Sequence, residues 1–190
     1  RGVVGGPDAA DNRTVARRCK PDRLPCVELP ASVRIAWTDK EPLQDADIVV
    51  CAIPVQFIRP VIDRLKEYIP QSAGVISVAK GIENGTLLRP TQIIADVLKD
   101  DPDAKPRPMG CMSGPAIAPE LAMCLPATMA AASDHPGFSE RIQELFSTSW
   151  LRIYTNPDLL GVELAGAAKN VIAIAAGSID GLGAGYNPKS

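Results

Sequence analysis

The sequence predicts an α/β fold in which the strands of a parallel sheet alternate with helices and one long helix follows the sheet. Two observations predict the sheet: short apolar segments end at polar residues or proline, and apolar residues recur at helical spacing between them. A third observation, a stretch of mostly small and apolar residues from 161 to 180, predicts the long helix. In such folds, ligands bind at the carboxyl ends of the parallel strands.

Five apolar segments have the composition of strands that are buried on both faces. They cover residues 48–53, 74–79, 109–112, 126–132 and 150–154. Apolar residues recur every three or four positions in the segments between and after them, which predicts helices. The predicted helices cover residues 57–69, 88–98, a short segment around Glu120, 139–146 and 158–179. Residues 1–40 contain four prolines and are predicted to be mostly loop, with a short helix at 14–19.

The composition excludes several classes of protein. Hydrophobic residues make up 46% and charged residues 22% of the 190 residues, so neither wholesale disorder nor a fibrous architecture is expected. A net charge of −2 and an aromatic content of 4% offer little to attract or stack a nucleic acid, so no nucleic-acid partner is expected. No uninterrupted apolar run reaches the roughly 18 residues of a membrane span, so no integral membrane segment is expected.

The cysteines and the single histidine do not form a pattern typical of a reactive site. The five cysteines contain no C-x-x-C pair and no metal-binding spacing, so we expect no disulfide, no metal and a reducing, cytoplasmic compartment. His135 lies in a polar segment and is expected in a surface turn, which argues against Ser-His-Asp and Cys-His hydrolysis. Gly181-x-Gly-x-Gly185 follows a predicted helix and lacks the spacing of a dinucleotide-binding turn.

Lys169 lies in the predicted long helix among mostly hydrophobic residues. Burial of an unpaired ammonium is costly, so a carboxylate, an amide or a bound anion is expected beside it, and Glu163 and Asn170 are candidates. A desolvated lysine can give up its proton near neutral pH, as a general acid in carbonyl reduction must. The alternative is a structural lysine whose amine reaches solvent. On neighbouring faces, small residues predict the close approach of another backbone, with Gly161, Ala165 and Ala168 on one stripe and Gly166 on the other.

Two further segments are predicted at the carboxyl edge of the sheet. Lys80 and Gly81 follow a predicted strand, and a lysine there suits a phosphate or a polarised oxygen. A solvated lysine at a strand end explains the position equally well. Residues 113–116, Ser-Gly-Pro-Ala, connect a strand to a helix, where backbone N–H groups could face an anion or simply close a tight turn.

Five segments, taken in order, resemble the NAD(P)-dependent glycerol-3-phosphate dehydrogenase family. The block Glu-Leu-x-Gly-x-x-Lys-Asn-Val, which contains Lys169, is the most specific of them. The matching segments span roughly residues 20–190 and cover Ile53–Phe57, Ala79–Glu83, Ser113–Glu120, Asp158–Ile174 and Asp180–Asn187. The resemblance implies a Rossmann-like NAD(P)-binding domain over residues 1–155 and the first helix of an all-α domain over residues 156–190.

The resemblance also implies roles for individual residues. Lys169 matches the catalytic lysine of the family, which would protonate the carbonyl oxygen of dihydroxyacetone phosphate as a hydride arrives from NAD(P)H. Lys80 matches a lysine that contacts both the substrate and the cofactor. The remaining implied positions are cofactor contacts at Phe57 and Ala118 and substrate contacts at Gly114, Ala116 and Asn170.

The sequence departs from the family pattern at several places. Ala116 stands where bacterial members carry Ser or Thr, which removes a hydroxyl donor. The sequence contains no Gly-x-Gly-x-x-Gly turn and no equivalent of most of the C-terminal domain. We therefore expect a fragment that is inactive alone, from a cytoplasmic enzyme that produces glycerol 3-phosphate for glycerophospholipid synthesis. The resemblance leaves NAD or NADP preference open and is compatible with a homodimer of the full-length protein.

Two alternatives remain open at this point. The chain as written could be a catalytically silent remnant or an interaction module. Another dehydrogenase of the same architecture, acting on an unphosphorylated hydroxy acid, would carry similar motifs.

Overall fold

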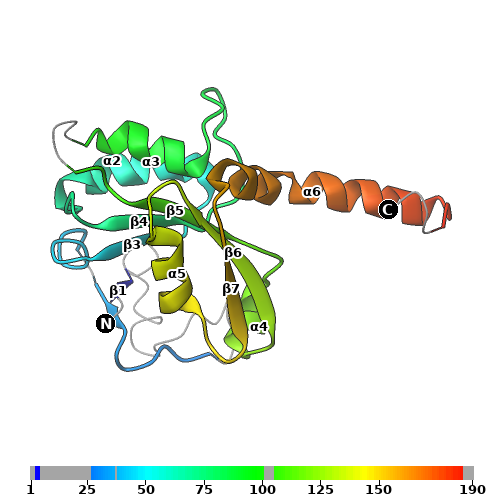
Figure 1. Cartoon of the computed structure of the whole chain (residues 1–190), viewed down its shortest axis with the longest axis horizontal. Helices are drawn as coiled ribbons and strands as arrows, with labels where there is room; N and C mark the ends of the chain where they lie inside the picture. Colours follow the sequence, from blue (N-terminus) through cyan, green and yellow to red (C-terminus); the bar gives the residue numbers. More distant parts are fainter. Residues whose placement is uncertain (1–2, 5–26, 37, 101–104, 186–190) are drawn as a thin grey trace.

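The computed structural model describes residues 3–4, 27–36, 38–100 and 105–185. Its main sheet has five strands in the order β3-β4-β5-β6-β7 (Figure 1). The strands of this sheet are β3 (Ile48–Cys51), β4 (Gly74–Ser77), β5 (Met109–Ser113), β6 (Ala127–Ser133) and β7 (Leu151–Asn156). Two further strands of two residues each, β1 (Val3–Val4) and β2 (Arg34–Ile35), pair in parallel and form a separate small sheet. The five predicted strands of the sheet are confirmed, and the pair β1-β2 lies where mostly loop was predicted.

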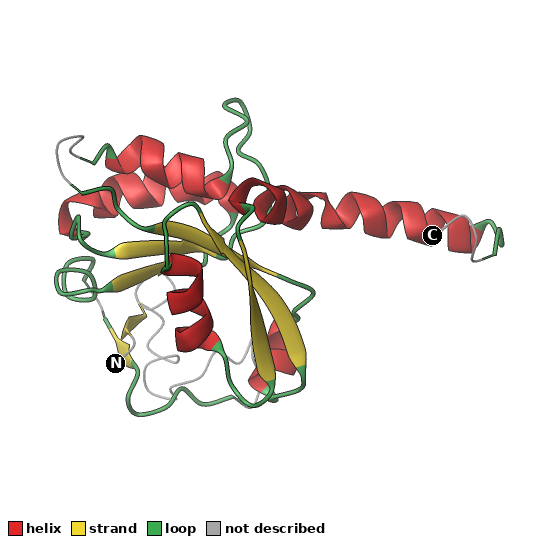
Figure 2. Cartoon of the chain, in the orientation of Figure 1, coloured by secondary structure: helices red, strands yellow, loops and turns green. Residues whose placement is uncertain are grey.

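Helices cover both faces of the sheet (Figure 2). Their bounds are α2 (Ile58–Leu65), α3 (Pro90–Leu98), α4 (Ala118–Ala122), α5 (Phe138–Phe146) and α6 (Leu159–Gly181), with 3-10 turns η2 (Val55–Phe57) and η3 (Lys66–Tyr68) flanking α2. Each of these helices falls where the spacing of apolar residues predicts one. The short helix predicted at 14–19 lies outside the described residues.

The sheet is mixed, whereas the sequence predicted a parallel one. Strands β3, β4 and β5 are parallel, but β6 pairs antiparallel with β5 and β7 runs parallel to β6. A parallel crossover needs a connection that carries the chain back along the whole strand, usually a helix. The connection between β5 and β6 contains only the five-residue helix α4, so β6 starts near the end at which β5 stops. As a result, only β3, β4 and β5 bring their carboxyl ends to the same edge.

The core lies on both faces of the sheet because successive residues of a strand point to opposite faces. On β4, Val75 belongs to a cluster with the isoleucines of α2 and α3, whereas Ile76 belongs to a second cluster with α5. Phe138 and Ile142 of α5 are the buried residues of this second cluster that come from a helix. These two clusters hold α2 and α3 on one face and α5 on the other, as in a doubly wound fold.

Helix α6 begins on the sheet and then leaves it (Figure 1). Asp158 caps its first turn by accepting a hydrogen bond from the backbone N–H of Gly161 at 2.7 Å. Leu159 and Val162 pack against Cys111 of β5 and Ala132 of β6. Most side chains after Gly166 are exposed.

The length and composition of α6 also match those of a membrane span. It is the one helix in the described part of the chain that passes this test, and 22% of its most apolar window is buried within the structure. The absence of a membrane segment, expected from the sequence, therefore stays a prediction.

Candidate functional site

The carboxyl edge of β3, β4 and β5 brings together three of the predicted site segments. Phe57 follows β3 in η2, Lys80 follows β4, and Gly114 follows β5. These strands are parallel neighbours, so their carboxyl ends meet at one edge although the three residues are far apart in sequence.

Lys80 is half-buried and turned toward the end of β5. Its ammonium donates a hydrogen bond to the carbonyl oxygen of Gly114 at 2.8 Å. Burial lowers the pKa of Lys80, and the positive charge of Lys169 lowers it further. Gly81, the next residue, has a φ of +130° and lies so close to Val55 that an added Cβ would be 2.9 Å from a methyl carbon of that residue. Only glycine suits this position, so the turn after Lys80 is fixed by backbone conformation as well as by contacts.

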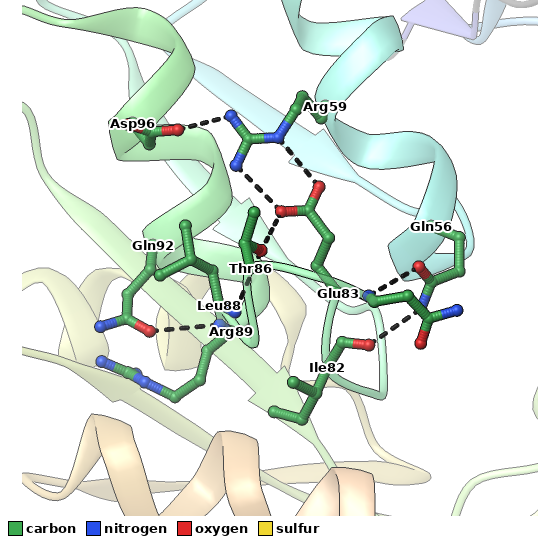
Figure 3. Close-up of polar contacts among 10 residues, drawn as sticks. Gln56, Arg59, Ile82, Glu83, Thr86, Leu88, Arg89, Gln92 and Asp96 are labelled. Atoms are coloured by element: carbon green, nitrogen blue, oxygen red, sulfur yellow. Dashed lines mark hydrogen bonds and ion pairs between the residues drawn. The ribbon is translucent and has the colours of Figure 1, made fainter.

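The loop that follows Lys80 is tied to the 3-10 turn that carries Phe57 (Figure 3). The side-chain amide of Gln56 donates to the carbonyl oxygen of Ile82 at 2.8 Å, and its oxygen accepts from the backbone N–H of Asn84 at 3.0 Å. The Gln56 side chain therefore satisfies one backbone carbonyl and one backbone N–H of the loop. This contact couples the position of Phe57 to the position of the loop that begins at Lys80.

A second set of contacts holds the same loop from the side of α2 and α3 (Figure 3). The guanidinium of Arg59 donates two hydrogen bonds to the carboxylate of Glu83, at 3.0 and 2.9 Å, and a third to Asp96. Thr86 donates its hydroxyl hydrogen to the same Glu83 carboxylate. These hydrogen bonds, from Arg59 first and Thr86 second, hold the pKa of Glu83 below its ordinary value. The network was not identified as part of the site from the sequence, although Gln56 and Glu83 lie within the segments that carry the resemblance.

The segment Ser113–Ala116 forms a tight turn at the end of β5. The carbonyl oxygen of Gly114 accepts the backbone N–H of Ala116 at 2.9 Å in addition to the Lys80 ammonium. A Cβ at Gly114 would lie 2.7 Å from the backbone oxygen of Thr128, so glycine lets this turn pack against β6. The N–H of Ala116 is thus used within the turn, and the tight-turn interpretation describes the geometry of this segment.

Gly166 is the point at which α6 approaches the carboxyl edge of the sheet. It is buried, and an added Cβ would lie 2.8 Å from the hydroxyl oxygen of Ser113 and 3.7 Å from Cγ of Lys80. The predicted stripe of Gly161, Ala165 and Ala168 does not make this contact, because Ala165 and Ala168 are exposed. The close approach is therefore made by Gly166, on the neighbouring stripe.

Lys169 lies one turn beyond Gly166, in the exposed part of α6. The expectation that its amine is desolvated among small residues is wrong for the described chain, because α6 has left the sheet by that point. The expected carboxylate partner is also wrong: Glu163 contacts Arg89 and Thr91 instead. Lys169 nevertheless lies one turn beyond the point at which Gly166 packs beside Lys80, and its charge contributes to the lowered pKa of Lys80. Two ammonium groups close together favour the binding of an anion.

The remaining predicted contact positions are accessible. Phe57 is 60% exposed, and Ala118 and Asn170 are also exposed, whereas Ala116 is half-buried. Their roles in cofactor and substrate binding stay predictions, since accessibility permits a contact but does not identify the ligand.

Two of the described cysteines are buried, and His135 lies in a turn. Cys51 and Cys111 are buried free thiols, and burial raises their pKa to about 11 and about 12. His135 lies in the turn after β6, where its Nδ1 is 3.0 Å from the carbonyl oxygen of Pro136. Within the described ranges, no group of three or more His, Cys, Asp or Glu residues could hold a metal ion.

Comparison with known proteins identifies relatives of the chain along most of its length. Residues 8–139 match the N-terminal model of NAD-dependent glycerol-3-phosphate dehydrogenase, and residues 158–190 match the C-terminal model of the same family. A glycerol-3-phosphate dehydrogenase [NAD(P)+] of Bacillus pumilus is 41% identical over 169 residues, which are 89% of this chain and 48% of that protein. A protein of the same name from Lactobacillus delbrueckii is 39% identical over 184 residues, which are 97% of this chain and 54% of that protein.

A solved structure supports the same relationship. The crystal structure of glycerol-3-phosphate dehydrogenase from Coxiella burnetii superposes with a TM-score of 0.84 at 28% sequence identity. The superposition covers 98% of this chain and 56% of that one, and the chain spans about half the length of the curated relatives it matches. Two family models in the correct order, relatives at about 40% identity and a matching fold agree with one another: the chain belongs to the NAD-dependent glycerol-3-phosphate dehydrogenase family.

Proposed function

We propose that the protein containing this chain is an NAD(P)-dependent sn-glycerol 3-phosphate dehydrogenase, which reversibly reduces dihydroxyacetone phosphate to glycerol 3-phosphate. One observation carries the proposal: Gly166 packs α6 beside Lys80, which follows β4, and so brings Lys169, one turn further along α6, to the same edge. The family match supports it, and the relatives from Bacillus pumilus and Lactobacillus delbrueckii are named for this activity.

The two lysines have different tasks in the proposed reaction. Lys169 donates a proton to the carbonyl oxygen of dihydroxyacetone phosphate and removes it in the reverse direction. Lys80, whose amine is fixed by the carbonyl oxygen of Gly114, holds the substrate against the cofactor as a point charge. An anionic substrate relieves the repulsion between the two ammonium groups, so binding is favoured most when both amines are charged.

We propose that residues at the carboxyl edge hold part of a nicotinamide dinucleotide. Phe57 offers an exposed ring at the end of β3, which suits contact with a planar heterocycle, and the Lys80 ammonium suits an anionic group. Ala118 at the start of α4 is exposed. The nicotinamide supplies the hydride when NAD or NADP is bound, and this chain supplies the groups that orient the substrate and move the proton.

The wider setting is part of the same proposal. Glycerol 3-phosphate is the backbone of glycerophospholipids, so we place the enzyme in glycerophospholipid synthesis. The free thiols Cys51 and Cys111 are compatible with the reducing cytoplasm. The sequence placed the domain boundary between residues 155 and 156; β7 continues to Asn156, so we place the boundary between β7 and α6. We propose that α6 packs in a helical domain and that the full-length protein forms a homodimer.

Substitution of Lys169 tests the proposed function. In the full-length protein, Lys169→Ala should lower kcat for dihydroxyacetone phosphate reduction by about 100-fold or more, because the proton donor is lost. The dissociation constant for NADH, measured by fluorescence, should stay within about twofold, because we place Lys169 at the substrate and not at the dinucleotide. Lys99→Ala, on the exposed end of α3, is the matched control and should leave kcat unchanged.

Two outcomes would contradict the proposal. Near parental kcat in Lys169→Ala would remove that residue from the mechanism. A full-length protein that reduces an unphosphorylated keto acid and leaves dihydroxyacetone phosphate unchanged would identify a different dehydrogenase of the same architecture.

A further inference from the structure

Glu163 is a buried carboxylate on the first part of α6. Its side chain is 2% exposed and that of Arg89, its ion-pair partner, is 15% exposed. The carboxylate also accepts the backbone N–H of Thr91 at 2.9 Å and the hydroxyl hydrogen of Thr91 at 2.7 Å. Three donors from Arg89 and Thr91 therefore converge on one side chain of a distant helix.

All three donors lie at the N-terminus of α3. Arg89 is the N-cap residue of this helix and Thr91 belongs to its first turn. The first backbone N–H groups of a helix have no partner within the helix, and the positive end of the helix dipole favours a carboxylate. Glu163 thus accepts the Thr91 N–H, which has no partner within α3. This hydrogen bond forms only when α6 places the Glu163 carboxylate at the N-terminus of α3.

This arrangement fixes α6 against sliding and rotation. A buried carboxylate without its partners is strongly destabilising, so a shift of α6 by one residue would be disfavoured. The close approach at Gly166 adds a second contact nearby, because a Cβ at that position would lie 2.8 Å from the Ser113 hydroxyl oxygen. Glu163 and Gly166 together define the rotation and the height of α6 on the sheet.

Lys169 depends on these two contacts for its position. It lies about 9 Å beyond Glu163 along the helix axis, at about 1.5 Å per residue. The helix has left the sheet at Lys169, so the sheet does not hold this residue directly. Any rotation at Glu163 is transmitted along the helix and moves the Lys169 amine away from Lys80.

We infer that Glu163, held by Arg89 and Thr91 at the N-terminus of α3, is a positioning residue that places Lys169 beside Lys80 for proton transfer. The inference rests on the proposed function, because it assigns a task to Glu163 only if Lys169 acts on a substrate at this edge. It predicts a catalytic effect from a residue that touches neither the substrate nor the cofactor.

Glu163→Gln in the full-length enzyme tests the inference. Glutamine keeps the volume of the side chain but loses the charge that pairs with Arg89. We expect kcat to fall about 10- to 100-fold, as for a catalytic group displaced by about 1 Å, with KM for NADH nearly unchanged. The primary kinetic isotope effect with 4-deuterated NADH should rise, because the chemical step becomes rate-limiting.

Asp100→Asn is the matched control for loss of stability. Arg107 is 3% exposed and donates two hydrogen bonds to Asp100, at 2.8 and 2.7 Å, just beyond the carboxyl end of α3. This variant breaks a comparable ion pair without touching α6. It should lower Tm as Glu163→Gln does, with kcat and the isotope effect unchanged. If Glu163→Gln and Asp100→Asn have the same kcat and the same isotope effect, the role of Glu163 is structural and the inference is overturned.

Thr91→Val provides a second test if Glu163→Gln does not fold. It removes one hydrogen bond to the carboxylate with little change in volume, and we expect a smaller fall in kcat with the same rise in isotope effect. A folded Thr91→Val enzyme with parental kcat and isotope effect would overturn the inference. Lys169→Ala, measured in parallel, separates the two proposals: if it is inactive while the Glu163 and Thr91 variants have parental kinetics, only the positioning role fails.

Discussion

Glu83 is a buried carboxylate whose partners come from separate segments of the chain. Arg59 of α2 donates to Glu83, and so does Thr86, which lies three residues after Glu83 in the same loop. The contact is reciprocal, since Glu83 is the main cause that raises the pKa of Arg59. At the scale of single residues, this pair joins the loop after Lys80 to the helical layer, so the acid sensitivity of the loop should depend on one titratable group.

The pH dependence of stability should report this group. The pKa of Glu83 is lowered in the folded protein from an ordinary value of 4.5. Its contribution to stability is therefore complete above pH 4.5 and is lost as the pH falls through the lower, folded pKa. Urea denaturation from about pH 6 to about pH 3 should show a smaller loss of stability in Glu83→Gln than in the parent protein.

Asp63→Asn is the control for this measurement. Asp63 forms an exposed ion pair with Lys66, and exposed pairs contribute about 0–1 kcal/mol. Its substitution should leave the acid limb of the parent profile nearly unchanged. An identical acid limb in Glu83→Gln and the parent would show that Glu83 does not govern the acid sensitivity.

At the scale of elements, α5 packs on the sheet through two glycines of neighbouring strands. Phe138 lies over Gly74 of β4 and Gly110 of β5, where added Cβ atoms would be 2.6 and 3.3 Å from its ring. A Cβ at Gly110 would also lie 2.8 Å from the backbone oxygen of Ala132 and 2.9 Å from Cδ1 of Ile142. Backbone atoms cannot move aside as a flexible side chain can, so α5 and β6 require glycine at this position.

Gly110→Ala should therefore lower the free energy of unfolding of the 190-residue chain by roughly 1–3 kcal/mol, as overpacking does in other cores. Gly177→Ala is the matched control, because nothing lies within 4 Å of a Cβ added at this helical position. It should stabilise the chain by up to about 1 kcal/mol through helix propensity. Equal urea midpoints for the two variants would contradict the packing argument.

At the scale of the whole molecule, the described structure ends in a helix with an exposed apolar surface. Val171, Ile172 and Ile174 are each at least 66% exposed on the part of α6 that has left the sheet. A surface of this kind is typical of a helix that packs against further protein. Lys169 lies next to it and is exposed in the described structure.

The 190-residue chain by itself should therefore show no turnover. A solvated lysine has no preorganised environment for proton transfer, so dihydroxyacetone phosphate should not increase the rate of NADH oxidation above the uncatalysed rate. The full-length protein at the same concentration is the positive control, and absorbance at the NADH band is the measurement. Turnover by the purified chain that is abolished by Lys169→Ala would contradict this prediction.

The sequence by itself determined the order and type of the elements in and around the five-stranded sheet. Apolar runs such as 74–79 and the spacing of apolar residues in 139–146 record burial on one or both faces, which is a local property of the chain. The same local patterns placed Lys80 and residues 113–116 at strand ends and Lys169 on the long helix, and the family motifs added their expected roles. These inferences needed no knowledge of which segments meet.

The tertiary structure alone decided what those residues contact. The antiparallel direction of β6, the pairing of Glu163 with α3 in place of Lys169, and the exposure of Lys169 depend on how distant segments pack. A hydrogen bond such as Thr91 to Glu163 joins residues far apart in the chain and leaves no periodic signal in the sequence. The periodicity of apolar residues indicates which side chains are buried. Which residue each of them contacts depends on how the helices pack on the sheet.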